Sequence, residues 1–152
     1  MLNEFLQKTE QELEKNCDLY FYSDSEVNKA ARYSLLNAGK RVRAMLIYLT
    51  AQMCGKNWQD YTDLACGVEM IHCYSLIHDD LPCMDDDDYR RGRLTNHKVF
   101  GEAMAVLAGD GLLTLAFEVM LEQKNVDPAV LIEVVREMAM CAGNFGMVGG
   151  QG

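Results

Sequence analysis

The residues with the clearest chemical potential lie in one stretch, His72 to Gly92, which reads H-C-Y-S-L-I-H-D-D-L-P-C-M-D-D-D-D-Y-R-R-G. Carboxylates at this density repel one another unless a cation lies among them. Mg²⁺ prefers hard oxygen ligands from carboxylates, completed by water and phosphate oxygens, and the planar fork of arginine matches phosphate. The stretch therefore predicts a site for Mg²⁺ and a phosphorylated substrate. Its charged residues are Asp79, Asp80, Asp85, Asp86, Asp87 and Asp88, followed by Arg90 and Arg91.

The spacing of Asp79 and Asp85 decides whether these two residues can share a metal ion. The run before them, Gly67 to His78, contains no helix breaker and predicts a helix. Residues six apart on an unbroken helix point in different directions. Pro82, however, cannot donate to the carbonyl four residues earlier, so the helix must loosen or kink. A local two-residue excursion would return Asp85 to the side of Asp79. The alternative interpretation is an acidic, solvent-facing helix end.

A second group of charges, Lys40, Arg41 and Arg43, lies where a helix is expected to begin. Cations at a helix N-terminus oppose the helix macrodipole, so they destabilise the helix unless an anion is bound. Lys40 and Arg43 are three residues apart and share one helix face, which favours a clamp for a diphosphate. The alternative is a solvated basic turn. His72 lies on the same helix face as Asp79, and this alignment favours contact with substrate over a purely structural role.

The pattern of apolar residues predicts an all-α protein of roughly six mostly antiparallel helices. The second helix is expected to end at Asn37-Ala38-Gly39, with Gly39 as its left-handed C′ residue. The third helix, Val42–Met53, is apolar on most sides and is expected to be buried. Residues 93–99 are expected to form a loop. The expected helices cover 2–22, a segment from a cap at Ser23 or Ser25 through Leu36, 42–53, 61–79, 101–124 and a last helix from Pro128 toward Gly143.

Composition narrows the class of protein. The 152 residues suffice for one globular domain, and the net charge of −9 argues against a nucleic-acid partner. We expect no membrane span, because no apolar run approaches the roughly 18–20 residues required. The polar N-terminus does not resemble a signal peptide, so we expect a cytoplasmic protein. The six cysteines contain no C-x-x-C pair, which predicts reduced, structural thiols.

These motifs together resemble a known family. The run D-D-L-P-C-M-D followed by D-D-D-Y-R-R-G resembles the first aspartate-rich motif of the trans-prenyl diphosphate synthases, in the bacterial and plastid form. The segments G-K-R-V-R at Gly39–Arg43 and G-M-V-G-G-Q at Gly146–Gln151 match in the same order. The resemblance covers nearly all of the chain. It implies that residues 1–152 are the N-terminal part of a polyprenyl synthase domain, folded as part of an isoprenoid-synthase helix bundle.

The resemblance also implies a reaction and roles for single residues. A prenyltransferase of this family joins isopentenyl diphosphate to an allylic diphosphate, with Mg²⁺ assisting ionisation. The expected product is short and all-trans, with farnesyl diphosphate preferred. By this resemblance Asp79 and Asp85 bind metal with Asp80 in support, and Arg90 meets the allylic diphosphate. The bulky side chain of Tyr74 would close the bottom of the pocket that receives the growing product chain. The residues expected to meet isopentenyl diphosphate are Lys40, Arg43, His72 and Arg91.

Other interpretations stay open at this point. The sequence holds no second aspartate-rich motif, so a non-catalytic, synthase-like subunit is one alternative, and we expect these residues alone not to be a working synthase. A geranylgeranyl diphosphate synthase is another, while the G-K-R-V-R segment argues against a terpene cyclase. We also expect a homodimer formed through the helix at 101–124. Ala44 and Leu94 stand where the family commonly has proline, which puts loop rigidity in doubt.

Overall fold

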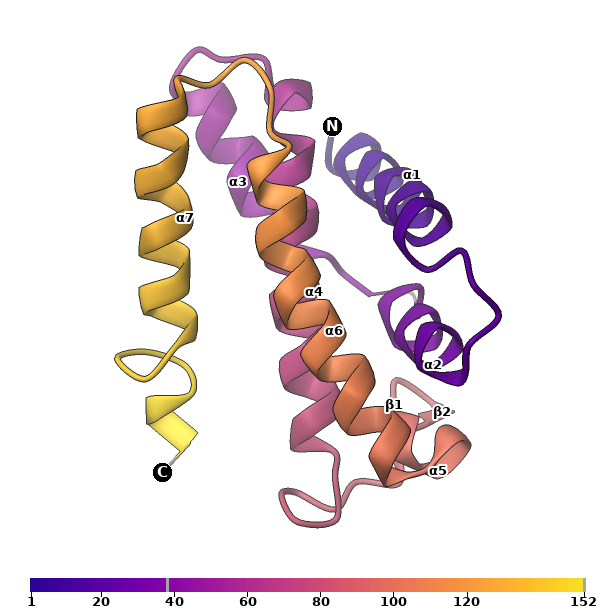
Figure 1. The fold of residues 1–152 in the computed structure, drawn as a ribbon. Helices are drawn as coiled ribbons and strands as arrows, with labels where there is room; N and C mark the ends of the chain where they lie inside the picture. Colours follow the sequence, from indigo (N-terminus) through magenta and orange to yellow (C-terminus); the bar gives the residue numbers. More distant parts are fainter. Residues whose placement is uncertain (38, 152) are drawn as a thin grey trace.

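The computed structural model describes residues 1–37 and 39–151, and within these residues the fold is mostly helical (Figure 1). This confirms the predicted all-α class; the only strands described form one short hairpin. Ser25 caps the second helix by accepting from the backbone N–H of Asn28, and Pro128 opens the last helix as expected. The elements are α1 Leu2–Tyr20, α2 Glu26–Leu35, α3 Val42–Met53, a 3₁₀ turn η1 Trp58–Tyr61, α4 Thr62–Asp79, β1 Tyr89–Arg90, β2 Arg93–Leu94, α5 Asn96–Phe100, α6 Glu102–Leu121, α7 Pro128–Ala142 and η2 Gly149–Gln151.

Two long helices, α4 and α6, form the centre of the molecule and pack along much of their length (Figure 1). Small residues on α6 allow this close approach, and Ala105, Ala108 and Gly109 are all buried. A Cβ on Gly109 would collide with the imidazole of His78, so only glycine fits there. The Nε2 atom of His78 lies 3.0 Å from the carbonyl oxygen of Val106, which ties the end of α4 to α6.

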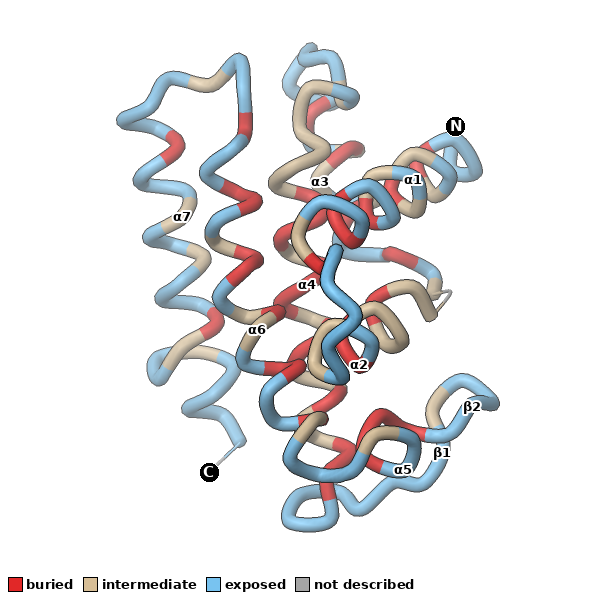
Figure 2. The backbone as a smooth tube through the Cα atoms, turned by 45° about the vertical axis from the view of Figure 1, so that its right-hand side comes forward, coloured by how far each residue is buried: buried red, intermediate tan, exposed pale blue. Residues whose placement is uncertain are grey.

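The helices α1, α2 and α3 cover one side of this central pair. The ring of Phe5 on α1 packs against Tyr48 of α3 and Trp58 of η1, with centroids 5.3 and 4.7 Å away. On the other side α7 stands apart, and Figure 2 shows it mostly exposed while buried residues concentrate on α4 and α6. Only Leu131 and Ala142 of α7 are buried.

Two helices present apolar side chains to solvent. The expectation that α3 is buried is wrong for much of its surface, because α3 is covered mainly where it faces α1, α4 and η1. Ala44, Tyr48 and Ala51 fill that contact, whereas Val42 and Leu46 are 49% and 58% exposed. The face of α7 is similarly open, with exposed residues at Val130, Ile132, Val134 and Met140.

The end of the second helix differs from the prediction. The helix stops at Leu35 with Leu36 as its C-cap, and Ala38 lies outside the described residues. Because Leu36 is the C-cap, the C′ position falls on Asn37, so the assignment of Gly39 as the C′ residue is wrong. Its glycine identity has another cause, because the guanidinium of Arg91 occupies the space where a Cβ would lie.

The predicted loop at 93–99 is also wrong in part. Tyr89–Leu94 forms a hairpin whose two-residue turn, Arg91-Gly92, has positive φ at both positions, the conformation such tight hairpins require. The short helix α5 follows at once. Its first residue, Asn96, donates from Nδ2 to the Ala30 carbonyl and to Ser34 Oγ of α2, both at 2.8 Å. These contacts, distant in sequence, order the segment.

The premise that no segment is long and apolar enough to span a membrane is wrong, while the expectation of no membrane span stays a prediction. Helix α6 is long and apolar enough to meet that test, with a mean hydropathy of 1.7 over its best window. In the fold, however, 44% of this window is buried against other helices. The central helix of a globular domain meets the same test, so this single segment is weak support for a membrane span.

Candidate functional site

The aspartate-rich turn follows directly from the end of α4. The helix ends at Asp79, and the turn that starts at Pro82 brings the chain back, so that the Asp85 N–H donates to the Asp79 carbonyl at 2.8 Å. The Asp87 N–H donates to the Asp80 carbonyl at 3.2 Å in the same way. The helix therefore ends instead of kinking and resuming. The expected excursion nevertheless occurs, and it places Asp85 beside Asp79.

The surroundings of Asp79 and Asp85 fit a magnesium site. Asp85 is exposed, and the half-buried Asp79 accepts a hydrogen bond on Oδ1 from the Gln151 side chain at 2.6 Å. Both residues offer carboxylate oxygens at an open surface, where water and phosphate oxygens can complete the coordination that Mg²⁺ prefers. Metal binding by these two residues stays a prediction.

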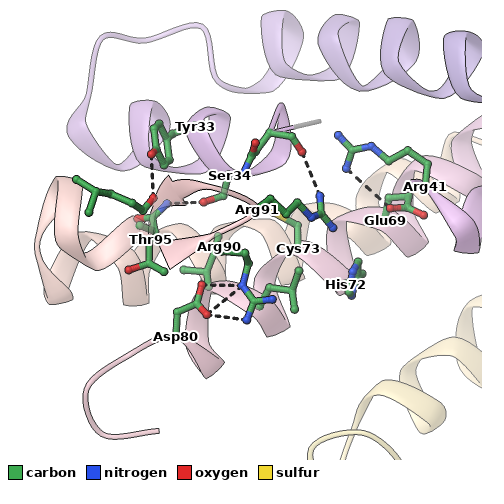
Figure 3. A pocket seen from close by; sticks show the side chains of 15 residues that line it. Tyr33, Ser34, Arg41, Glu69, His72, Cys73, Asp80, Arg90, Arg91 and Thr95 are labelled. Atoms are coloured by element: carbon green, nitrogen blue, oxygen red, sulfur yellow. Dashed lines mark hydrogen bonds and ion pairs between the residues drawn. The ribbon is translucent and has the colours of Figure 1, made fainter. Parts of the chain in front are cut away.

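Asp80 and Arg90 form a closely paired ion pair instead of facing separate ligands. Arg90 donates from Nε to both carboxylate oxygens of Asp80, at 3.0 and 2.9 Å, and from Nη2 to Oδ1 at 2.7 Å (Figure 3). The Asp80 side chain is 4% exposed and that of Arg90 is 32% exposed. The hydrogen bonds that Arg90 donates to Asp80 raise the pKa of Arg90 above its usual value. In this structure Asp80 thus neutralises Arg90, while the catalytic role of Asp80 and the substrate-binding role of Arg90 stay predictions.

Four of the predicted substrate-binding residues meet at one hollow. Lys40, Arg43, His72 and Arg91 line a depression of about 500 Å³ at the start of α3. A narrower cavity of about 40 Å³ shares His72 and Arg91 with it and reaches Asp80 and Arg90 (Figure 3). Three cationic side chains and a histidine around one opening can hold an anion, as the N-terminal position on α3 also favours.

His72 is neutral at physiological pH. Burial, which has the largest effect, and the positive charges of Arg43, Arg91 and Arg90 together lower its pKa to about 4. The positive charges that oppose protonation of His72 also attract an anion. A bound diphosphate would therefore offset these cations and raise the pKa of His72.

The hairpin turn places Arg91 at the hollow. Its backbone is left-handed, with φ 52°, and its Nη1 donates to the Asn37 carbonyl at 3.2 Å. The guanidinium passes directly over Gly39, so a side chain at this position would have to displace it. The glycine and the arginine from two distant motifs therefore form one wall of the hollow.

Tyr74 lies away from the hollow, in the apolar core. It is 6% exposed, and its ring packs edge-on against His78 with centroids 5.6 Å apart. Burial, together with the nearby charge of Asp79, raises the pKa of its hydroxyl. The residue is therefore a bulky core side chain one turn and a half before the aspartates, and its part in setting product length stays a prediction.

The sequence-based prediction missed a buried ionic network next to the hollow. Arg41 is 5% exposed and contacts Glu10 of α1 and Glu69 of α4, and Glu69 also accepts from the backbone N–H of Ala44. One signal was available, because Glu69 lies three residues before His72 and so shares its helix face. The inward turn of Arg41 had no such signal.

A second acidic group was also missed. Asp86, Asp88 and His97 bring one potential ligand atom each to within 4.8 Å of one another. Asp88 is already paired with Lys98 at 2.9 Å, and both aspartates are exposed. The backbone of Asp86 is left-handed, with φ 54°, which no spacing rule predicts.

Comparisons with known proteins find relatives over most of the chain. A family model described as polyprenyl synthetase matches residues 24–151. The farnesyl diphosphate synthase of Geobacillus stearothermophilus is 46% identical over 155 residues, covering 99% of this chain and 52% of that protein. A chloroplastic geranylgeranyl pyrophosphate synthase of Arabidopsis thaliana is 54% identical over 127 residues, covering 82% of this chain and 36% of that protein.

A solved structure shows the same architecture. The geranyltransferase of Legionella pneumophila superimposes with a TM-score of 0.93 at 37% identity, covering 99% of this chain and 53% of that one. The chain spans about half the length of the bacterial relatives that it matches. The arrangement of helices is therefore shared with a longer protein.

Proposed function

The chain belongs to the polyprenyl synthetase family, and from this premise we propose that the protein containing it is a prenyltransferase. It would join isopentenyl diphosphate to an allylic diphosphate, dimethylallyl or geranyl diphosphate, head to tail. The observation that carries the proposal is the convergence of Lys40, Arg43, His72 and Arg91 on one hollow. This hollow shares Arg41, Glu69, His72 and Arg91 with the cavity that reaches the end of α4.

The chain's own residues would act by charge and position. Lys40, Arg43 and Arg91 would hold the diphosphate of isopentenyl diphosphate, and His72, being neutral, would donate or accept a hydrogen bond there. Asp79 and Asp85 would hold Mg²⁺, which would draw negative charge from the allylic diphosphate as its C–O bond ionises. The paired Asp80 would keep Arg90 oriented toward the same diphosphate.

We propose farnesyl diphosphate as the product, because the bulky side chain of Tyr74 near the aspartates would limit the length of the chain. The 54% identity to plastid geranylgeranyl pyrophosphate synthases supports the longer product as the second candidate. The two candidates are separated by incubating the full-length protein with geranyl diphosphate and labelled isopentenyl diphosphate and measuring chain length. A C20 product as the main species would contradict the farnesyl assignment.

The metal assignment can be tested by comparing aspartates within the same turn. Replacing Asp79 or Asp85 by Ala in the full-length protein is expected to reduce turnover far more than Asp87→Ala. Equal losses in all three variants would show a diffuse patch of charge instead of a defined site. Because Mg²⁺ sheds water reluctantly, we expect appreciable Mg²⁺ binding only when a diphosphate is present, and calorimetry with and without pyrophosphate measures this.

We further propose that the full-length protein forms a homodimer through α6. Exposed apolar side chains on that helix, Val106, Leu107 and Leu121, support this contact. A non-catalytic subunit is the competing proposal. Absence of any condensation by the full-length protein with Mg²⁺ and both substrates would favour it.

A further inference from the structure

We infer that Glu69 is a positioning residue for the diphosphate hollow, acting through Arg41 and the first turn of α3. This inference rests on the proposed function, because it concerns how the hollow is built for isopentenyl diphosphate. Glu69 is 2% exposed and lies on α4, three residues before His72. It borders the hollow but is buried behind the cationic residues that face it.

Charged side chains at the start of α3 differ in whether they face solvent or the interior. Lys40 and Arg43 are exposed, whereas Arg41 between them is buried. Arg41 reaches the interior because its backbone is left-handed, with φ 46°. A non-glycine residue in this region is strained and persists only where its surroundings hold it. The contacts of Arg41 therefore decide which way its two neighbours point.

Those contacts come from three directions. Arg41 donates from Nε to Glu10 at 2.7 Å and from Nη2 to the Leu35 carbonyl at 2.8 Å. Its Nη1 lies 3.9 Å from Oε2 of Glu69. The Glu10 side chain is partly exposed, so water and salt screen its charge, whereas the Glu69 side chain is buried. The negative charge of Glu69 therefore acts on Arg41 with less screening by solvent.

Glu69 also contacts the backbone at the first turn of α3. Arg41 is the N-cap of α3 and provides no side-chain cap, and three cations cluster at this positive helix end. Oε1 of Glu69 accepts the N–H of Ala44 at 3.1 Å, one of the donors that an α-helix leaves unpaired in its first turn. A carboxylate from α4 thus caps α3 from outside. This donor exists because residue 44 is alanine and not proline.

Together these contacts couple α4 to the segment that carries Lys40 and Arg43. The Glu69 carboxylate adds to the contacts that hold Arg41 inward and accepts a hydrogen bond from the first turn of α3, while His72 on the same face of α4 borders the hollow. Glu69 therefore sets the distance between the cations of α3 and the histidine of α4. It does not touch the proposed substrate.

Positioning and simple electrostatics predict opposite results for Glu69→Gln. Removing a negative charge beside a cationic hollow would by itself tighten diphosphate binding. Loss of positioning would weaken it, roughly tenfold if one charge-assisted contact is lost. Glu69→Asp keeps the charge but withdraws the carboxylate from Ala44 and Arg41, so positioning again predicts weaker binding, whereas a pure field effect predicts no change.

The experiment uses the full-length protein with Glu69→Gln, Glu69→Asp and the control Asp63→Asn, which removes another acid of α4 that lines neither cavity. The KM values for isopentenyl and geranyl diphosphate are measured separately, and the Kd of pyrophosphate is measured in metal-free buffer. We expect both Glu69 variants to raise the KM for isopentenyl diphosphate and the Kd for pyrophosphate roughly tenfold. The KM for geranyl diphosphate should change less than about twofold, and the control should match wild type.

Three results would overturn the inference. A lower KM for isopentenyl diphosphate in Glu69→Gln would show a field effect, and equal rises in both KM values would show general loss of structure. If Glu69→Gln does not fold, an unchanged KM for isopentenyl diphosphate in Glu69→Asp is enough to overturn the inference. A wild-type protein that binds pyrophosphate without making prenyl product would contradict the proposed function only, because the Kd comparison still tests Glu69.

Discussion

Replacing Asp80 by Asn should destabilise the folded protein even when no metal is present. The Asp80 carboxylate is nearly enclosed and receives three hydrogen bonds from Arg90. Asparagine keeps the shape and one acceptor but removes the charge and turns an N–H₂ group toward the guanidinium. The prediction distinguishes a structural ion pair from a metal ligand at Asp80, because only the ion pair stabilises the fold when no Mg²⁺ is present.

The magnitude follows from the burial of the two partners. Breaking a buried ion pair by removing one member costs about 3–5 kcal/mol, since the other charge is left unpaired. The Arg90 side chain is 32% exposed, so water partly solvates the charge that remains. We therefore expect a loss of about 2–3 kcal/mol in the free energy of unfolding, reduced from the fully buried case.

The assay is urea unfolding of the full-length protein in EDTA, followed by far-UV circular dichroism. Asp79→Asn is the matched control, because its Oδ1 can still accept from Gln151, and it should not lower the unfolding free energy. The Asp80→Asn/Arg90→Gln double variant should show a coupling energy of about 2 kcal/mol. If Asp80→Asn is as stable as wild type in EDTA and loses only the stabilisation given by Mg²⁺ and pyrophosphate, Asp80 is a ligand and the reasoning is refuted.

Three further predictions concern the hollow and the core. Gly39→Ala should displace Arg91 and raise the Kd for pyrophosphate roughly tenfold by calorimetry, whereas Gly111→Ala, which has open space, should not. Since the folded pKa of His72 is about 4 against an ordinary 6.5, the wild type should lose stability as pH falls from 6.5 toward 4, and His72→Gln should lose less in urea titrations at each pH. Tyr74→Ala should lengthen the products of the full-length protein, and an unchanged chain-length distribution would remove Tyr74 from that role.

The features predicted correctly from sequence are those set by local chemistry. Helix α3 has the expected bounds, Ser25 caps α2, and Pro128 opens α7, because caps and breakers act within one turn. The return of Asp85 to Asp79 also follows from a single proline. The convergence of Lys40, Arg43, His72 and Arg91 was expected from the family resemblance, not from spacing, since the residues come from three separate segments.

The features that were missed depend on contacts between distant segments. The inward turn of Arg41 needs Glu10 and Glu69, and neither its neighbours nor its own propensity indicate a left-handed backbone. The order in 93–99 depends on Asn96 reaching α2. The open apolar face of α3, predicted to be buried, shows that composition indicates burial but not which partner supplies it.

The contact between His78 and Gly109 restricts how the central pair of helices can move. The imidazole fills the space that any larger residue would need, and its bond to Val106 adds a directional tie. Sliding α6 along α4 by one turn, about 5.4 Å, would drive a side chain into that ring. Shear between the two helices is therefore opposed at the position next to Asp79. The carboxylate that begins the aspartate turn thus stands on a part of the fold that resists sliding.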